Sequence, residues 1–205
     1  MNPQKVQLID AGTGNLQSVY NALNNLNAEI RLVASGLECR KDEKTILPGV
    51  GAFRRFMEGL VERDLMEGIL EIAQDGTPLL GICVGMQAML DSSEEMGDTP
   101  GLGLIPGVVK RFPEKKGYTI PHTGWNDITF SGSPALLKDI TPGSYFYFNH
   151  SYFCQPSNPV NSLARTEYIL EFSSAVICGN CCGVQFHPEK SQNLGRQLIA
   201  NFLSM

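Results

Sequence analysis

The order of apolar and polar positions divides the chain into two parts. In residues 1–90, short apolar runs alternate with stretches whose apolar residues recur at helical spacing. Strands are predicted at residues 5–9, 30–33, 44–47 and 78–82, and helices at residues 16–26, 53–73 and 84–90. Because strands and helices alternate, this part predicts a mostly parallel sheet with helices on both faces.

The second part is richer in β-branched and aromatic residues, which favour strands, and has glycine-proline turns at residues 132–134 and 142–143. Gly179-Asn180 lies between two β-like runs and predicts a hairpin turn. A last amphipathic helix is predicted at residues 194–203. No repeat or linker interrupts the chain. We therefore predict a single domain, residues 1–205, built as an α/β three-layer sandwich: a mostly parallel central sheet plus an antiparallel β section.

Composition narrows the function class. The 205 residues are 42% hydrophobic and 18% charged, with a net charge of -5. No basic run exceeds two residues, which argues against a nucleic-acid partner. No apolar run approaches the roughly 18 residues that a membrane span needs. Without a visible secretory signal, the six scattered cysteines are interpreted as reduced thiols, so we expect a cytoplasmic protein that acts on a small molecule.

The segment LGICVGMQ, residues 80–87, carries the strongest chemical signal. Cys83 lies where a buried strand runs into a helix, with Gly81 and Gly85 two positions to either side. This is the pattern of a nucleophile elbow, in which a strained turn requires small neighbours. A helix N-terminus favours a thiolate, and the backbone N–H of Val84 can donate to a developing oxyanion.

A nucleophilic cysteine needs a base, and His187 is the best candidate. It follows an apolar run that we expect to end exposed at a strand terminus, and Pro188 and Glu189 come next. A proline turn can return the Glu189 carboxylate to one imidazole nitrogen and leave the other for the Cys83 proton. In α/β-hydrolases the acid precedes the histidine in the chain. Here Glu189 follows His187, which argues against an α/β-hydrolase. His122 and His150 are interpreted as structural or pocket-lining residues.

Two other patterns are set aside. The glycine turn Gly12-Thr13-Gly14-Asn15 follows a strand, but Gln17 fills the place of the third glycine of a dinucleotide fingerprint. The C-x-x-C of Cys178 and Cys181 has no second ligand pair to complete a zinc site. We therefore expect no metal and no cofactor.

Taken with GVQFHPEKS, the segment LGICVGMQ resembles the class I glutamine amidotransferases. More closely, the chain is similar to the glutaminase subunits of imidazole glycerol phosphate synthase, an enzyme of histidine biosynthesis. The matching segments extend from residue 10 to residue 191. They are DAGTGNLQS at residue 10, LPGVGAF at residue 47, IPHTGWN at residue 120, YFNHSY at residue 147 and Lys190-Ser191.

The resemblance implies roles for individual residues. Cys83 would be the nucleophile, His187 the general base and acid, and Glu189 its orienting carboxylate. The remaining roles fall into three groups. The oxyanion hole would use Gly49, Val50, Gly51 and Val84, the glutamine site would use Gln87, Glu95, His150 and Ser151, and the partner-facing side would carry Asn15, Trp125 and Lys190.

The resemblance also implies a partner. Such a subunit hydrolyses L-glutamine to glutamate and ammonia, and forms a heterodimer with a (β/α)₈-barrel cyclase. The ammonia passes through the barrel, which forms imidazole glycerol phosphate and AICAR. The free glutaminase is nearly silent until the liganded partner completes the oxyanion hole.

The chain departs from the family pattern at Ala11, Val84, Thr123 and Asn149. These departures leave open a paralogous glutaminase that feeds a different barrel synthase, such as one amidating a surface-sugar precursor. A non-catalytic thiol sensor on the same fold and a thiol hydrolase of small esters are further alternatives.

Overall fold

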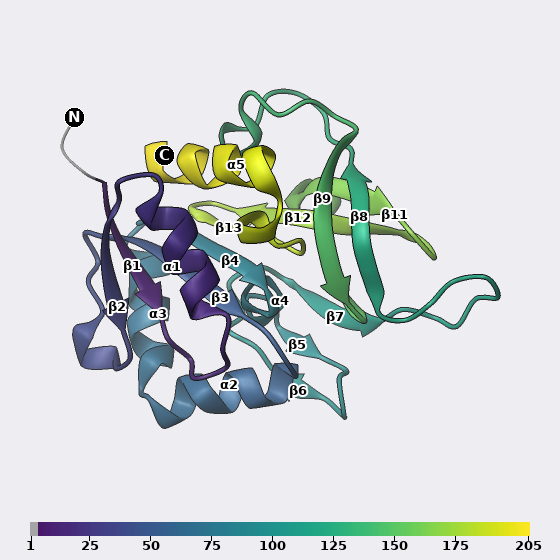
Figure 1. The fold of residues 1–205 in the computed structure, drawn as a ribbon. Coiled ribbons are helices and arrows are strands. Elements are labelled where there is room, and N and C mark those ends of the chain that lie inside the picture. The colour runs from purple at the N-terminus through teal and green to yellow at the C-terminus, as the bar shows by residue number, and fades with distance from the viewer. Residues whose placement is uncertain (1–3) are drawn as a thin grey trace.

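The computed structural model describes residues 4–205. The first three residues, which belong to the N-terminal segment inspected for a secretory signal, lie outside the described range. A central sheet of eleven strands passes through the molecule, and a separate two-stranded sheet lies beside it (Figure 1). One buried apolar cluster extends from Val6 to Leu203. No helix in the described range is long and apolar enough to cross a membrane.

Half of the central sheet is parallel, as the alternating pattern predicts. Its strands run in the order β2 (Glu29–Val33), β1 (Lys5–Ile9), β3 (Lys44–Gly49), β4 (Leu79–Cys83) and β13 (Cys181–Val184). Every residue of β4 and β13 is buried, as expected for central strands covered on both faces. The last strand, β13, comes from the far end of the chain and brings it beside β4.

Helices cover both faces of this parallel half (Figure 1). On one face α1 (Leu16–Asn24) contacts α5 (Gln192–Ser204), and on the other α2 contacts α3 and α4. The predicted helix at residues 53–73 is in fact two, α2 (Phe53–Glu62) and α3 (Leu65–Gln74). Asp64 between them is left-handed at φ 54°, and the Arg63 carbonyl accepts from Gly36 N–H instead of continuing the helix.

Helix α4 (Val84–Ala88) is shorter than the predicted 84–90. The segment that follows takes its carbonyls: Leu102 N–H donates to the Ala88 oxygen, and Leu104 N–H to that of Met89. Such hydrogen bonds cannot be read from local spacing, because their donors lie well beyond the helix.

The remaining strands pair mostly antiparallel. From β13 the sheet continues through β12 (Glu171–Cys178), β10 (Tyr152–Pro156), β7 (Gly107–Arg111), β5 (Ser92–Ser93) and β6 (Thr99–Pro100), with β11 (Ser162–Glu167) also on β12. Only the β5–β7 contact in this part is parallel. β8 (His122–Ile128) and β9 (Ser144–His150) form the second sheet. Short 3₁₀ turns complete the chain: η1 (Gly36–Glu38), η2 (Ala135–Leu137), η3 (Pro159–Asn161) and η4 (Pro188–Lys190).

The predicted hairpin at Gly179-Asn180 joins β12 to β13, with Cys178 paired directly with Cys181. Gly179 has φ 58°, a conformation that glycine adopts without strain. The Asn180 side chain donates to the carbonyls of Ala73 and Thr77 and so ties the turn to the end of α3. The β12–β13 register thereby fixes where the last parallel strand ends.

Candidate active site

The turn at Cys83 is strained, as the elbow pattern predicts. Cys83 ends β4 with φ 54° and ψ -111°, a conformation that side chains rarely adopt. A Cβ added to Gly85 would lie 1.8 Å from the Leu47 oxygen, and one added to Gly81 would lie 2.7 Å from the Gly85 oxygen. The two glycines therefore let the backbone segments meet closely enough to hold the strained residue in place.

His187 reaches the elbow by a different path from the one predicted. The strand β13 ends at Val184, and His187 is 2% exposed, so the expectation of an exposed strand terminus was wrong. Its backbone N–H donates to the Tyr147 oxygen on β9, at 2.8 Å. The chain leaves the central sheet because this bond attaches it to the second one.

The short turn η4 returns Glu189 to the imidazole. His187 Nδ1 lies 2.8 Å from Glu189 Oε1, and the carboxylate side chain is fully buried. Nε2 is then the nitrogen left for Cys83, which lines the same cavity. Burial lowers the pKa of His187, but the neighbouring Cys83 and Glu189 side chains outweigh it, so the pKa lies well above its ordinary value of 6.5.

Cys83 and His187 open into a cavity of about 290 Å³. Most residues to which the resemblance gives a role line this cavity. They are Val50, Gly51, Cys83, Val84, Gln87, Glu95, His150, Ser151, His187 and Lys190, joined by Pro121, Asn149 and Tyr152. Gly49, Glu189, Asn15 and Trp125 do not line it. The cavity therefore gathers segments from across the chain around one thiol.

The wall beside the nucleophile comes from the end of β3 and the two residues that follow it. Gly49 pairs with Cys83 in the β3–β4 register, which places Val50 and Gly51 beside the elbow. A Cβ on Gly49 would lie 2.7 Å from the Gly85 nitrogen, and Gly51 has φ 89°. Glycine is thus required at residue 49 for space and favoured at residue 51 by conformation.

Two of the residues expected at the glutamine site are partly committed to other bonds. Glu95 Oε2 accepts the Phe53 N–H at the start of α2, at 2.7 Å, which leaves Oε1 for a ligand. His150 Nδ1 donates to the Tyr152 oxygen at 2.8 Å, and its Nε2 accepts from His122 Nδ1 at 3.1 Å. Because a carbonyl only accepts, these tautomers are fixed, and His150 offers the cavity its ring surface rather than a free nitrogen.

Both of these histidines are neutral. Burial lowers the pKa of His122 to about 4 and that of His150 to about 3. Phe148 stacks on His122 at 4.8 Å between ring centroids, and Phe112 lies 5.3 Å from His150. The two histidines form an uncharged wall, packed by aromatic rings, in the cavity that also holds His187.

The three residues expected on the partner-facing side differ in their surroundings. Trp125 is 47% exposed on β8. The exposed Lys190 borders the cavity, with its Nζ 5.8 Å from the centroid of the Tyr147 ring. Asn15 is instead turned inward, and its Nδ2 donates to Glu189 Oε1 at 2.7 Å.

Two of the four departures from the family pattern compensate each other. Thr123 and Asn149 are paired in the β8–β9 register, and Thr123 Oγ1 donates to Asn149 Oδ1 at 3.0 Å. A polar residue at one position is therefore matched by a polar residue at the other. Ala11 is buried, and its carbonyl lies close under Gly59 of α2.

Gln185 is not among the residues predicted for the site, yet it is fully buried and its Nε2 lies 3.7 Å from Cys83 Sγ. A polar side chain within the apolar run before His187 is the signal that could have identified it. Tyr152 was also missed, although its carbonyl accepts from both Gln87 and His150.

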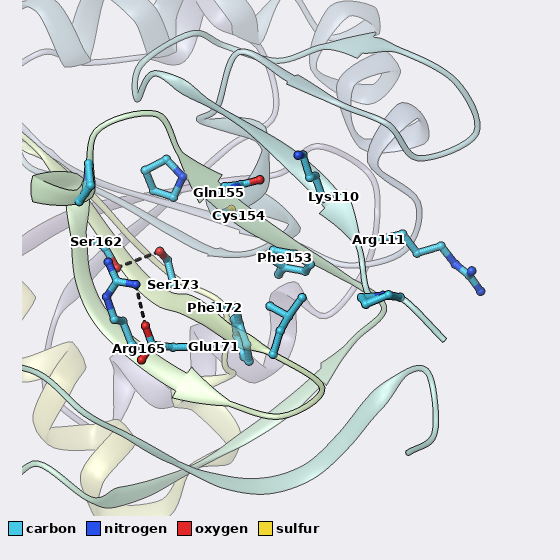
Figure 2. Close-up of a pocket in the computed structure, with 14 residues that line it drawn as sticks. Lys110, Arg111, Phe153, Cys154, Gln155, Ser162, Arg165, Glu171, Phe172 and Ser173 are labelled. Atoms are coloured by element: carbon cyan, nitrogen blue, oxygen red, sulfur yellow. Dashed lines mark hydrogen bonds and ion pairs between the residues drawn. The ribbon is translucent and has the colours of Figure 1, made fainter. Parts of the chain in front are cut away.

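A larger hollow, of about 590 Å³, lies between β7, β10, β11 and β12 (Figure 2). Arg165 and Glu171, from the neighbouring strands β11 and β12, pair at one wall of the hollow at 2.8 Å, and Ser173 donates to Ser162. Cys154 lines it, but burial strongly raises the pKa of that thiol. The smaller cavity is therefore the candidate active site, because it holds the nucleophile and the base, whereas the larger hollow does not. Among residues 4–205, no three His, Cys, Asp or Glu side chains are grouped as metal ligands.

The fold and the cavity agree with comparisons to known proteins. The chain belongs to the class I glutamine amidotransferases, since the family model Glutamine amidotransferase class-I matches residues 7–205. Two solved structures share the fold. One is titled as a glutamine amidotransferase (TM-score 0.74, 20% identity, 97% of each chain), and the other is PurLQS from Thermotoga maritima (TM-score 0.74, 18% identity, 100% and 99%).

Curated relatives narrow the class further. The imidazole glycerol phosphate synthase subunit HisH of Moorella thermoacetica is 44% identical over 197 residues, covering 96% of this chain and 93% of the relative. The proteins of the same name from Bacillus cereus strain AH187 and Gloeobacter violaceus are 41% and 39% identical, covering 96% and 97% of this chain and 93% and 88% of theirs. Within the class, the chain is a member of this HisH family.

Proposed function

We propose that this chain, acting as a single domain, is the glutaminase subunit of an imidazole glycerol phosphate synthase in histidine biosynthesis. It hydrolyses the side-chain amide of L-glutamine and supplies the ammonia to its synthase partner. One observation carries the proposal: the strained Cys83 shares a cavity with His187, whose imidazole is bonded to the buried Glu189 carboxylate. The relatives' shared name favours the histidine pathway over a paralogue with another partner, and the complete base-acid pair argues against a mere thiol sensor.

In the first half-reaction Cys83 forms a thioester. His187 Nε2 takes the thiol proton, and the sulfur attacks the δ-carbon of glutamine. The carbon–nitrogen bond then breaks, and His187 returns the proton to the leaving nitrogen, so that ammonia departs. Glu189 stabilises the imidazolium between these two transfers.

In the second half-reaction water replaces ammonia. His187 removes a proton from water, whose oxygen attacks the thioester carbon. Glutamate leaves, and the proton restores the Cys83 thiol. The steps need neither a metal nor a cofactor, because a thiolate and an imidazole supply the nucleophile and the proton transfers.

Both half-reactions place negative charge on the former carbonyl oxygen of glutamine. The Val84 N–H, directly after the nucleophile, is one donor for it. The second donor would be the Val50 N–H, held between Gly49 and Gly51. A missing donor of this kind costs about 100- to 1000-fold in turnover. A wall at residues 49–51 that turns only in the complex would therefore account for a poised but slow free subunit.

The same cavity offers contacts for the rest of glutamine. Glu95 Oε1 would hold the α-amino group. Both Nε2 hydrogens of Gln87 are used inside the protein, so its Oε1 is the atom that faces the substrate. Ser151 would contribute a hydroxyl and His150 a ring surface.

The relatives are named as subunits of imidazole glycerol phosphate synthase. This chain therefore also works as a subunit of a synthase complex. We propose that the partner is a (β/α)₈-barrel cyclase, joined as a heterodimer through the side that carries Trp125 and Lys190. Ammonia in bulk water becomes protonated and loses its nucleophilicity, so a direct path into the partner is required. Six free thiols support a cytoplasmic location for the complex.

The test is an assay of glutamate release from glutamine, with and without the barrel subunit and its ligand. We expect slow release by the free chain, fast release in the liganded complex and none above background for Cys83→Ala. Absence of release from the wild-type complex would exclude the proposed activity. A complex that stays active with Cys83→Ala would exclude the mechanism.

A further inference from the structure

Gln185 contacts the nucleophile but does not line the cavity around it. It lies directly after β13, is 0% exposed, and its Nε2 donates to Cys83 Sγ at 3.7 Å. Cys83 itself is 4% exposed, so little water reaches the sulfur. A thiolate with so little access to water depends largely on protein donors for its stability.

The hydrogen-bond network fixes which end of the Gln185 amide faces the sulfur. The Tyr152 carbonyl can only accept, so Gln87 must present its NH₂ group there, at 3.0 Å. The same Nε2 donates to Gln185 Oε1, also at 3.0 Å. With its oxygen committed to Gln87, Gln185 can turn only its NH₂ group toward Cys83.

We propose that Gln185 is a positioning residue that holds the Cys83 sulfur in place and stabilises its thiolate by donating a hydrogen bond. This role of Gln185 rests on the proposed function only because Cys83 is taken as the nucleophile. The chain Tyr152–Gln87–Gln185–Cys83 sets the direction of donation. His187 supplies the proton transfers, whereas Gln185 supplies a fixed donor that never leaves the sulfur.

The need for a hydrogen-bond donor to the sulfur explains why an amide is present at residue 185. A glutamate would present an oxygen to the sulfur and repel the thiolate. A methionine would have similar length and would pack, but it donates nothing. The direction of hydrogen-bond donation along Tyr152, Gln87, Gln185 and Cys83, and not the available space alone, therefore requires an amide at residue 185.

The experiment measures alkylation of Cys83 by iodoacetamide across pH, followed by mass spectrometry of the Cys83 peptide. Alkylation needs the thiolate but no glutamine turnover, so the result stands whether or not the chain is a glutaminase. We expect Gln185→Met and Gln185→Glu to be alkylated at least about tenfold more slowly at neutral pH, with the rise displaced to higher pH. Gln7→Met, which removes another fully buried amide on β1, should leave the pH profile unchanged.

A purely structural role would lower the thermal stability of the Gln185 variants without displacing the alkylation profile. Folded Gln185→Met and Gln185→Glu proteins with the wild-type profile would overturn the proposal. A second measurement needs no change at residue 185. In Cys83→Ala, the side-chain amide protons of Gln185 should shift in NMR spectra and exchange faster, while those of Gln7 stay as they are. Unchanged Gln185 signals would count equally against the proposal.

Discussion

At the scale of single residues, Asn15 links the glycine turn after β1 to Glu189, the carboxylate proposed to orient His187. Glu189 Oε1 accepts from both His187 and Asn15, and among the described residues its buried Oε2 has no partner. Asn15 is therefore the only other donor that the described protein gives this carboxylate. Its left-handed backbone, at φ 60°, turns the amide inward from the start of α1.

We expect Asn15→Ala to lower kcat by roughly tenfold or more, because a hydrogen bond to a charged, buried group is lost. KM should change little, since neither residue lines the cavity. Asn15→Asp should be worse, because it places a second carboxylate against Glu189. Glutaminase kinetics of the complex measure this. Gln17→Ala, which removes only an exposed bond to Asn21, is the control. Equal kcat in Asn15→Ala and wild type would contradict the expectation.

At the scale of elements, β8 and β9 carry a pH-sensitive contact. His122 and His150 are paired in register, and their imidazoles are held neutral with pKa values lowered to about 4 and about 3. An unfolded histidine takes up its proton near pH 6.5. Below that pH the unfolded chain binds more protons than the folded one, so stability must fall as the pH drops from 6.5 toward 4.

Each histidine contributes a slope of about 1.4 kcal/mol per pH unit to this loss. We expect His122→Gln to remove one of the two contributions, so that its unfolding free energy falls less steeply between pH 6 and pH 4.5. Urea unfolding at several pH values measures the slope. If the unfolding free energy of the variant fell with pH as steeply as that of the wild type, His122 would not take up a proton on unfolding. His187 acts in the opposite direction and at higher pH: its raised pKa makes stability fall as the pH rises above 6.5.

Local patterns predict elements well where the signal is periodic and poorly where distant donors intervene. The parallel strands, the terminal helix and the Gly179-Asn180 hairpin follow from apolar spacing and turn residues. The break at Asp64 does not, because a distant N–H, that of Gly36, takes the Arg63 carbonyl. For the same reason the end of β13 lies earlier than expected, since Tyr147 holds His187 on the other sheet.

The candidate site shows the same division. The short motif around Cys83 and the His-Pro-Glu turn could be found in sequence because each is local. The inward turn of Asn15 and the bond from Gln185 to Cys83 join residues 174 and 102 positions apart. Spacing carries no information about such contacts, and only the fold brings them together.

At the scale of the whole molecule, the parallel sheet does the positioning. The ends of β3 and β4 and the segment after β13 meet at one edge, as expected for sites at the carboxyl ends of parallel strands. The β8–β9 sheet closes the cavity through His150 and presents Trp125 at the surface. A partner seated there would lie close to Lys190 and the wall at residues 49–51.

The most direct test is to trap the intermediate. The complex with its barrel subunit and ligand is mixed with glutamine, quenched with acid before steady state, and digested for mass spectrometry. We predict a γ-glutamyl adduct on the peptide that contains Cys83, and no adduct and no glutamate release for Cys83→Ala. An adduct on another residue, or glutamate released by Cys83→Ala at the wild-type rate, would contradict it.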